Sequence, residues 1–163
     1  MTKCRVCNCD LGELPMCFGS SSPASSIVPP DEYNSRVEEN ADQCIIDDQH
    51  YFVRGHIELP IKGSKDVFVW SVWVSLSPES FEDMSEHWDQ KGREYRDPYF
   101  GWLSTSLPCY PDTLHMKTSV QSMAVGEVPL ITLEPSEHPL SIEQALGVSL
   151  DRVHEIVHQV LSH

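Results

Sequence analysis

Residues 67–76 read VFVWSVWVSL, and their pattern is the strongest indication of the fold class. Val69 and Trp73 make one face of this stretch partly apolar. The opposite face is apolar throughout and carries Phe68, Trp70, Val72, Val74 and Leu76. A strand with two apolar faces is stable only where both are covered. The pattern therefore predicts a central strand of a sheet.

A second strand is expected just before it, from Tyr51 to Pro60, ahead of a turn at Gly63 and Ser64. One side of this strand carries Tyr51, Val53, Gly55, Ile57 and Leu59, and the other carries Phe52, Arg54, His56 and Glu58. Shorter alternating runs predict further strands over residues 114–120 and 130–133. Strands joined by such short connections usually pair antiparallel.

Helices are expected before, between and after these strands. Ser77 and Pro78 begin one that Gly92 ends, and residues 30–44 are predicted to form a short one. Near the C-terminus, a capping box at residues 141–144 and the apolar stripe of residues 149–161 predict two more. The predicted fold class is α+β: an antiparallel sheet with flanking helices and a Cys-rich N-terminal knuckle.

At 163 residues, of which 40% are apolar, the chain is expected to form one domain over residues 1–163. Within it, residues 1–19 are a Cys-rich head, residues 20–30 a connecting loop, and residues 31–163 the α+β body. The loop, SSSPASSIVPP, is rich in serine and proline, so we expect it to bury little and to form no helix. The turn-rich aromatic segment 95–113 is expected to be a long packed loop.

The charge of the chain narrows the classes of partner. The chain has 11 Lys and Arg and 25 Asp and Glu, which gives a net charge of −14. Proteins that bind nucleic acids or anionic membranes need clustered Lys and Arg, so these partners are disfavoured. No apolar stretch approaches the roughly 20 residues of a membrane helix, and the first residues lack a signal-peptide core. We therefore expect a cytoplasmic protein with a protein partner, no nucleic acid and no membrane. The oligomeric state stays open.

Four of the six cysteines lie within the first 17 residues. Cys4 and Cys7 have the C-x-x-C spacing of a zinc knuckle, in which both thiolates reach one ion. Two more ligands would be needed, and the candidates are Cys9, Cys17, Cys44, His50, His56 and His138. Free buried thiols and a redox pair are the alternatives to a structural zinc.

The segment HEIVH, residues 154–158, matches the H-E-x-x-H pattern of zinc-dependent hydrolases. In such enzymes two imidazoles hold zinc and the Glu activates a metal-bound water. A third ligand normally follows downstream, where this sequence offers only His163, on the same or a fraying turn. Both imidazoles also flank an apolar stripe, as in a docked surface helix. A hydrolase is therefore the alternative function, and the residues favour a structural helix.

Arg54, His56 and Glu58 share one strand face at intervals of about 7 Å. A cation, an imidazole and a carboxylate in one row would bind an anion or serve acid–base chemistry. A solvated sheet face with a cross-strand ion pair accounts for the same row.

The aromatic segment and the histidine after it supply the remaining binding candidates. Its aromatic and polar side chains would line a ligand cleft or a partner surface, or would cover the core as a lid. These side chains are Tyr99, Phe100, Trp102, Tyr110, Asp112 and His115. His138, ahead of a helix, is a turn residue or a zinc ligand.

Motifs spread along nearly the whole chain resemble the bacterial family called domain of unknown function 2199. They are Cys4-x-x-Cys7, Asp42-Gln43-Cys44, Phe52-Val53-Arg54-Gly55, Trp70 to Leu76, Phe100 to Leu103, Tyr110 to Leu114 and His138 to Leu140. The resemblance implies a bacterial cytosolic single domain without an established activity. It also implies Cys44 as the third zinc ligand and leaves the fourth unassigned. This sequence departs from the family pattern at Asn8 and Leu11, and its H-E-x-x-H residues match no family motif.

These features favour a non-catalytic protein-binding module with a structural zinc held by Cys4, Cys7 and Cys44. An immunity-type protein that neutralises a toxin is a particular case. Its binding residues would be Arg54, His56, Glu58, Trp102, Tyr110, Asp112 and His138. The alternatives are the zinc-dependent hydrolase and a small-ligand binder, and the sequence leaves open whether the chain is an enzyme.

Overall fold

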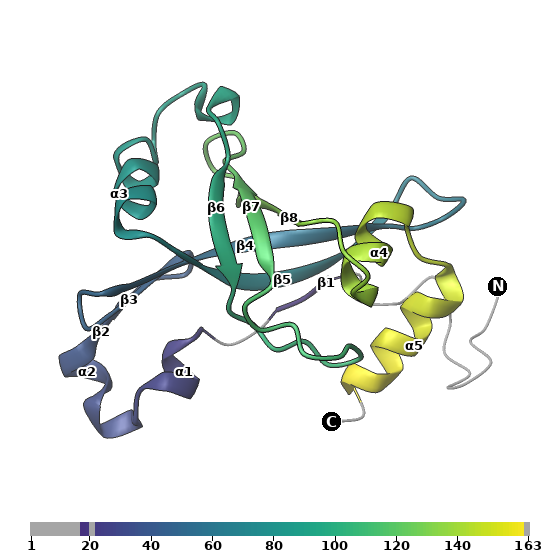
Figure 1. Ribbon diagram of the computed structural model, residues 1–163, viewed down its shortest axis with the longest axis horizontal. Coiled ribbons are helices and arrows are strands. Elements are labelled where there is room, and N and C mark those ends of the chain that lie inside the picture. The colour runs from purple at the N-terminus through teal and green to yellow at the C-terminus, as the bar shows by residue number, and fades with distance from the viewer. Residues whose placement is uncertain (1–16, 20–21, 162–163) are drawn as a thin grey trace.

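A long hairpin of two strands, β4 (His50–Pro60) and β5 (Val67–Leu76), runs through the computed structural model (Figure 1). The structure describes residues 17–19 and 22–161. The two strands pair antiparallel over their whole length, with Val53 opposite Val74. Both lie where the alternation of the sequence predicts them. The inward side of each strand is apolar, which is what a shared core requires.

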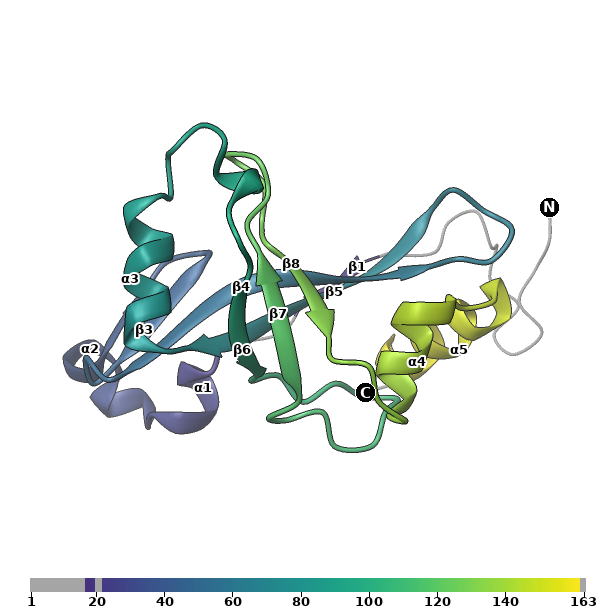
Figure 2. The ribbon, with the colours of Figure 1, turned by 45° about the horizontal axis from the view of Figure 1, so that its top comes forward.

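Three further strands close the hairpin into a barrel. β6 (Tyr99–Leu103) pairs with β5, β7 (Lys117–Gln121) pairs with β6, and β8 (Leu130–Leu133) pairs with β7, each antiparallel. β8 then returns to β4 in parallel, where Leu130 lies opposite His56. The strands β4 to β8 thus form a closed ring, with β6 to β8 crossing the long hairpin (Figure 2). The α+β class is confirmed, but the sheet is mixed rather than purely antiparallel.

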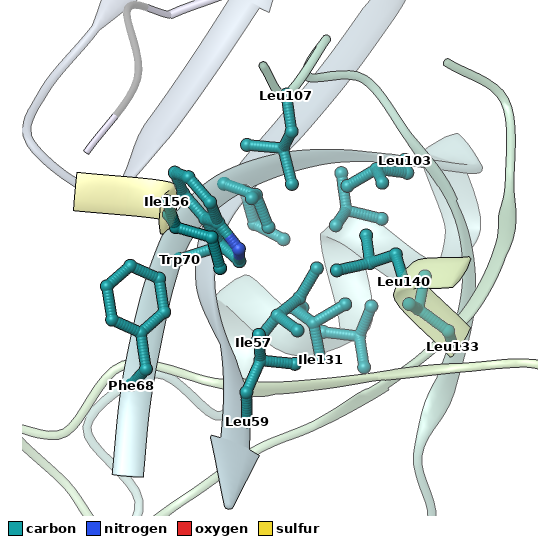
Figure 3. Close-up of a cluster of buried hydrophobic side chains, with 14 of the residues drawn as sticks. Ile57, Leu59, Phe68, Trp70, Leu103, Leu107, Ile131, Leu133, Leu140 and Ile156 are labelled. Atoms are coloured by element: carbon teal, nitrogen blue, oxygen red, sulfur yellow. The ribbon is translucent and has the colours of Figure 1, made fainter. Parts of the chain in front are cut away.

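The main core fills the barrel and the space beneath two C-terminal helices, α4 (Pro139–Leu146) and α5 (Leu150–Leu161). Figure 3 shows side chains from the strands pointing toward one another, with Leu140 and Ile156 of the helices among them. Fully buried members include Phe68, Trp70, Ile57, Leu59, Leu103 and Ile131. No helix in the described part of the chain is long and apolar enough to cross a membrane.

A second, smaller core lies on the outer face of the hairpin. It is covered by β2 (Val37–Glu39), β3 (Gln43–Ile46) and the short helix α1 (Ala24–Ile27). Phe52 and Trp73 contribute to it because they alternate with residues that face the barrel. Its other members are Ala24, Val28, Val37, Cys44 and Ile46. The hairpin therefore separates two cores.

Shorter elements complete the chain. β1 (Cys17–Phe18) pairs in parallel with β5. The single turns η2 (Pro30–Glu32) and α2 (Tyr33–Arg36) lead into β2. The helix α3 (Pro78–Glu86) and the turn η3 (Arg93–Tyr95) connect β5 to β6. The Ser77 side chain accepts a hydrogen bond from the backbone N–H of Ser80, as predicted for the start of α3.

The prediction of one helix over residues 30–44 is wrong beyond Arg36, because β2 and β3 form a hairpin there. The Asn40 side chain accepts hydrogen bonds from the backbone N–H groups of Asp42 and Gln43, which fixes the turn. β3 also pairs with β4, so pairing with a distant strand overrides the weak helical pattern.

The segment of residues 20–30 is not a loop throughout, since Ala24–Ile27 forms α1. This helix buries Ala24 to 1% exposure, contrary to the expectation that the segment buries little. The expected loop 95–113 contains β6. Gly101 allows this strand to lie against β5, because a Cβ atom there would collide with the Val74 side chain and lie 3.0 Å from the Ser75 carbonyl oxygen.

Three boundaries also differ from the prediction. α3 ends at Glu86 rather than near Gly92, and β7 begins at Lys117 rather than Leu114. α4 begins at Pro139, before the expected capping box at Ser141. The Ser141 hydroxyl is buried and donates to the Glu134 carbonyl oxygen, so it ties the helix to the strand before it.

Candidate functional site

An apolar hollow of about 600 Å³ opens on the outer face of the barrel. Phe52 is buried and lines it, and Trp102 of β6 stands in its wall. Both residues face outward because their neighbours Val53 and Leu103 face the barrel core. The remaining lining residues come from α1, the strand ends and the loop before β7: Pro23, Ile27, His50, Ser75, Ser104, Leu114 and His115.

The mouth of this hollow exposes large apolar side chains. Ile27 is 49% exposed, and Trp102 and Leu114 are each 41% exposed. A concave surface whose apolar side chains are only partly covered is typical of a binding site.

A second hollow, of about 420 Å³, lies on the other side of β6. Phe100, 52% exposed, stands in its wall and packs edge-on against Trp102, with the ring centroids 5.0 Å apart. Its other lining residues come from β7 and from the end of β8: Lys117, Thr118, Ser119, Thr132, Leu133, Glu134 and Pro135. We call the two hollows and the Phe100–Trp102 ridge between them the aromatic groove.

The wall formed by the loop before β7 is held by hydrogen bonds. The backbone N–H of His115 donates to the Leu103 carbonyl oxygen at 2.7 Å, and the N–H of Leu114 donates to Asp112 Oδ1. His115 has a φ of +67°, a conformation that few non-glycine residues adopt. The loop is thus pinned in one shape, and the position of Leu114 follows from it.

Arg54, His56 and Glu58 share one face of β4, as predicted, but they lie outside the aromatic groove. Arg54 forms an ion pair with Asp42 at 2.9 Å and donates to the Ala41 carbonyl oxygen. These bonds match the cross-strand ion pair that the sequence offered as the simpler account. His56 and Glu58 border a separate hollow, where burial and then the charge of Arg54 lower the pKa of the imidazole.

Tyr110, Asp112 and His138 are not among the described residues that line the groove. The Tyr110 hydroxyl accepts a hydrogen bond from Trp70 Nε1, and burial raises the pKa of that phenol. His138 caps α4, because its Nδ1 accepts from the Leu140 N–H. Its other ring nitrogen lies 3.0 Å from the Asp112 carbonyl oxygen, so it donates there. Of the binding candidates in the aromatic segment, Phe100, Trp102 and His115 line the groove.

A family model covers this whole region of the chain. It is described as an uncharacterized protein conserved in bacteria (DUF2199), and it matches residues 3–148. The chain belongs to this family. The match includes every strand and every residue of the aromatic groove, and confirms the resemblance noted in the sequence. No curated protein and no solved structure matches the chain.

Within the DUF2199 match, Cys4 and Cys7 lie outside the described residues, so their part in a zinc site stays a prediction. Cys44 is described and buried in the second core. Burial, followed by the charge of Glu39, raises the pKa of its thiol to about 11. As a zinc ligand it would have to give up that proton.

The HEIVH segment follows the DUF2199 match, which ends at Val148. Its two imidazoles have different surroundings: His154 is 2% exposed, whereas His158 is exposed. Glu155 forms an ion pair with Arg152 at 3.3 Å. In the described part of the chain, no group of three clustered metal-ligating side chains includes these residues. The segment is therefore a structural part of α5: His154 lies on its packed face, and Glu155 and His158 lie on its solvated face.

Three side chains of α3 and its C-cap do cluster, with ligand atoms of Asp83, Glu86 and His87 within 4.8 Å of one another. Asp83 already accepts hydrogen bonds from Tyr99 at 2.6 Å and from Arg96 at 2.8 Å. These two bonds lower the pKa of its carboxyl. The cluster thus joins α3 to the start of β6.

The sequence did not point to Ile27, Phe52 or Leu114 as members of a site. Phe52 carried a usable signal, since it is the one large apolar residue on the otherwise polar face of its strand. Ile27 and Leu114 come from segments whose local pattern says nothing about the surface they meet.

Proposed function

We propose that this DUF2199 protein is a non-catalytic protein-binding module, and that the aromatic groove receives an apolar segment of its partner. The observation that carries the proposal is the mouth of the first hollow, where Ile27, Trp102 and Leu114 are each more than two fifths exposed above the buried Phe52. Exposed aromatic and aliphatic side chains around a concave surface are typical of the residues that dominate binding energy.

The charge of the chain supports a basic partner. Its net charge is −14, and Lys117 is the single cation among the described residues that line the groove. Glu134 lines the second hollow, and Asp48 and Asp112 lie two residues from lining residues of the first. A negative surface speeds the encounter with a positive protein and disfavours acidic competitors. An immunity-type protein that binds a basic toxin is one form of this proposal. We also propose that this DUF2199 protein acts in the cytoplasm.

A structural zinc held by Cys4, Cys7 and Cys44 belongs to the same proposal. Cys44 packs in the second core beside Ala24 of α1, and α1 and its N-cap supply Ile27 and Pro23 to the groove. Tying the head of the chain to Cys44 would brace the helix that forms one wall. The fourth ligand stays open.

A small-ligand binder is the second candidate, and the size of the first hollow favours it. A volume of about 600 Å³ falls within the range of small-molecule sites, and His50, Ser75, Ser104 and His115 supply a few polar groups. The exposed Phe100–Trp102 ridge and the second hollow beside it favour an occupant that is longer than a small molecule.

The test is photocrosslinking with a photoreactive phenylalanine analogue in place of Leu114, in a lysate of the source organism. We expect one crosslinked protein, basic by its sequence, whose yield falls at least about tenfold with Trp102→Ala. The matched control is Tyr95→Ala, because Tyr95 is an aromatic residue 88% exposed and outside both hollows.

Equal yields from the two variants would contradict the proposal, as would an acidic crosslinked protein. Circular dichroism of each variant separates lost binding from lost folding. A thermal shift with a metabolite library, without a crosslinked protein, would support the small-ligand binder instead.

A further inference from the structure

We infer that the aromatic groove binds its partner as an extended segment with two apolar side chains four positions apart, a small residue midway, and Lys or Arg at the flanks. The inference rests on the proposed function and adds to it the sequence pattern of the partner. It follows from the spacing of the two hollows and from the ridge that separates them.

The strand register places the hollows on opposite sides of β6. Trp102 lies opposite Ser75 of β5 on one side and opposite Lys117 of β7 on the other. Phe100 lies opposite Ser119, which in turn lies opposite Thr132 of β8. The first hollow is thus on the β4–β5 side and the second on the β7–β8 side. Neighbouring strands are about 4.8 Å apart, so two to three spacings separate the hollows by roughly 10–14 Å.

An extended segment matches this separation. With a rise of about 3.3 Å per residue, side chains at positions i and i+4 lie roughly 13 Å apart on the same face. Positions i and i+2 are only about 7 Å apart, which is too short. The two anchors therefore enter one hollow each when they are four positions apart.

The ridge restricts the residue midway between the anchors. In an extended segment, the side chain at i+2 points to the same face as the anchors and meets Phe100 and Trp102. These rings are 52% and 41% exposed, so they occupy the space that a large side chain would need. Position i+2 must therefore be Gly, Ala or Ser. A helix would bring two side chains, i+3 and i+4, onto the same ridge, which disfavours a helical segment.

The acidic residues around the groove favour Lys or Arg on either side of the two anchors of the bound segment. Glu134 borders the second hollow, and Asp48 and Asp112 lie close in sequence to lining residues of the first. Among the described residues that line the two hollows, Lys117 is the one Lys or Arg. Asp48 and Asp112 are exposed, so Lys or Arg just outside the two anchors would meet a negative surface.

The experiment is the panning of a phage-displayed library of random nine-residue peptides against the folded chain. Phage that also bind Trp102→Ala are removed at each round. We expect enriched peptides with aromatic or aliphatic residues at i and i+4, a small residue at i+2 and Lys or Arg outside them. For the best peptide, Phe100→Ala and Leu114→Ala should each raise Kd about tenfold, because each removes one wall of a hollow. Tyr95→Ala should leave Kd within about twofold.

Enriched peptides with another spacing, a large residue at i+2 or acidic flanks would overturn the inference, and so would the absence of enrichment. The proposed function fails separately, when crosslinking at Leu114 captures no basic protein that depends on Trp102. If a basic partner is captured and its crosslinked segment lacks the pattern, the function stands and the inference falls.

Discussion

The most unusual single residue is His154, a buried imidazole in α5. It is 2% exposed, and neither ring nitrogen has a hydrogen-bond partner among the residues that the structure describes. Burial lowers the pKa of this imidazole, because the charged form loses its hydration, and Asp151 opposes the effect only in part. Unpaired buried donors and acceptors usually destabilise the fold. His154 is therefore a local weak point of the C-terminal helix.

Replacing His154 with Leu should stabilise the protein by about 1–2 kcal/mol at pH 7.5, since Leu keeps the packing and leaves no unpaired nitrogen. The wild type should lose stability as the pH falls below about 6.5, where the unfolded chain binds a proton that the native imidazole, with its lowered pKa, does not yet accept. Above that pH both states are neutral, so this residue adds no pH dependence.

Urea unfolding at pH 5.5 and 7.5 measures both effects, with His158→Leu as the exposed control on the same helix. The pH dependence should shrink in His154→Leu and persist in His158→Leu. A His154→Leu chain less stable than the wild type at both pH values would show that the imidazole has a stabilising partner.

At the scale of elements, β4 is the strand on which the molecule depends most. Its inward residues fill the barrel, Phe52 enters the second core and lines the groove, and Arg54 reaches back to Asp42. Ile131 of β8 and Pro129, the residue before β8, approach β4 at Gly55. The strand that closes the barrel therefore meets β4 where β4 has no side chain.

Gly55→Ala should destabilise the protein by about 1–3 kcal/mol, because the added Cβ would lie 2.6 Å from Ile131 Cδ1 and 3.0 Å from the Pro129 carbonyl oxygen. In a chain of this size, the loss should lower the Tm by roughly 2–4 °C per kcal/mol. Gly19→Ala is the control, because no atom of the described residues lies within 4 Å of a Cβ built there. Similar melting temperatures for both variants would mean that β8 moves aside at little cost.

At the scale of the whole molecule, the long hairpin carries different structures at its two ends. β2, β3, α1 and α2 gather at one end, and α4 and α5 at the other (Figure 1). The barrel lies between them, and the aromatic groove lies on its outer face beside α1. The proposed zinc would join the first residues of the chain to Cys44, at the end that carries α1.

Protein purified without a His tag should hold about one zinc ion per chain, because four ligands complete a structural site. Cys4→Ser and Cys44→Ser should each lower the zinc content measured by mass spectrometry, since each removes a thiolate. Cys109→Ser is the control, a partly buried thiol on the loop before β7. Zinc that is lost in Cys4→Ser and kept in Cys44→Ser would exclude Cys44 as a ligand, and a wild type without zinc would exclude the site.

Much of the fold could be predicted because its signals are local. The two-faced pattern of residues 67–76 identified β5, the alternation after Tyr51 identified β4, and Ser77 marked the start of α3. Each of these features depends on neighbours within a few positions, so periodicity and capping preferences suffice. The candidate site was harder to predict: the sequence singled out Phe100, Trp102 and His115 of the aromatic groove as binding candidates, but not the aliphatic residues around them.

The long hairpin, the α+β class, the acidic character and the family of this protein can all be recognised from its amino-acid sequence. Three features depend on tertiary contacts instead: the two strands within residues 37–46, the position of Phe100 and Trp102 on β6, and the closure of five strands into a ring. The aromatic groove belongs to this second group, since α1, β4, β6 and the loop before β7 meet there from distant parts of the chain. Such contacts depend on the pairing of whole strands, which local periodicity does not specify.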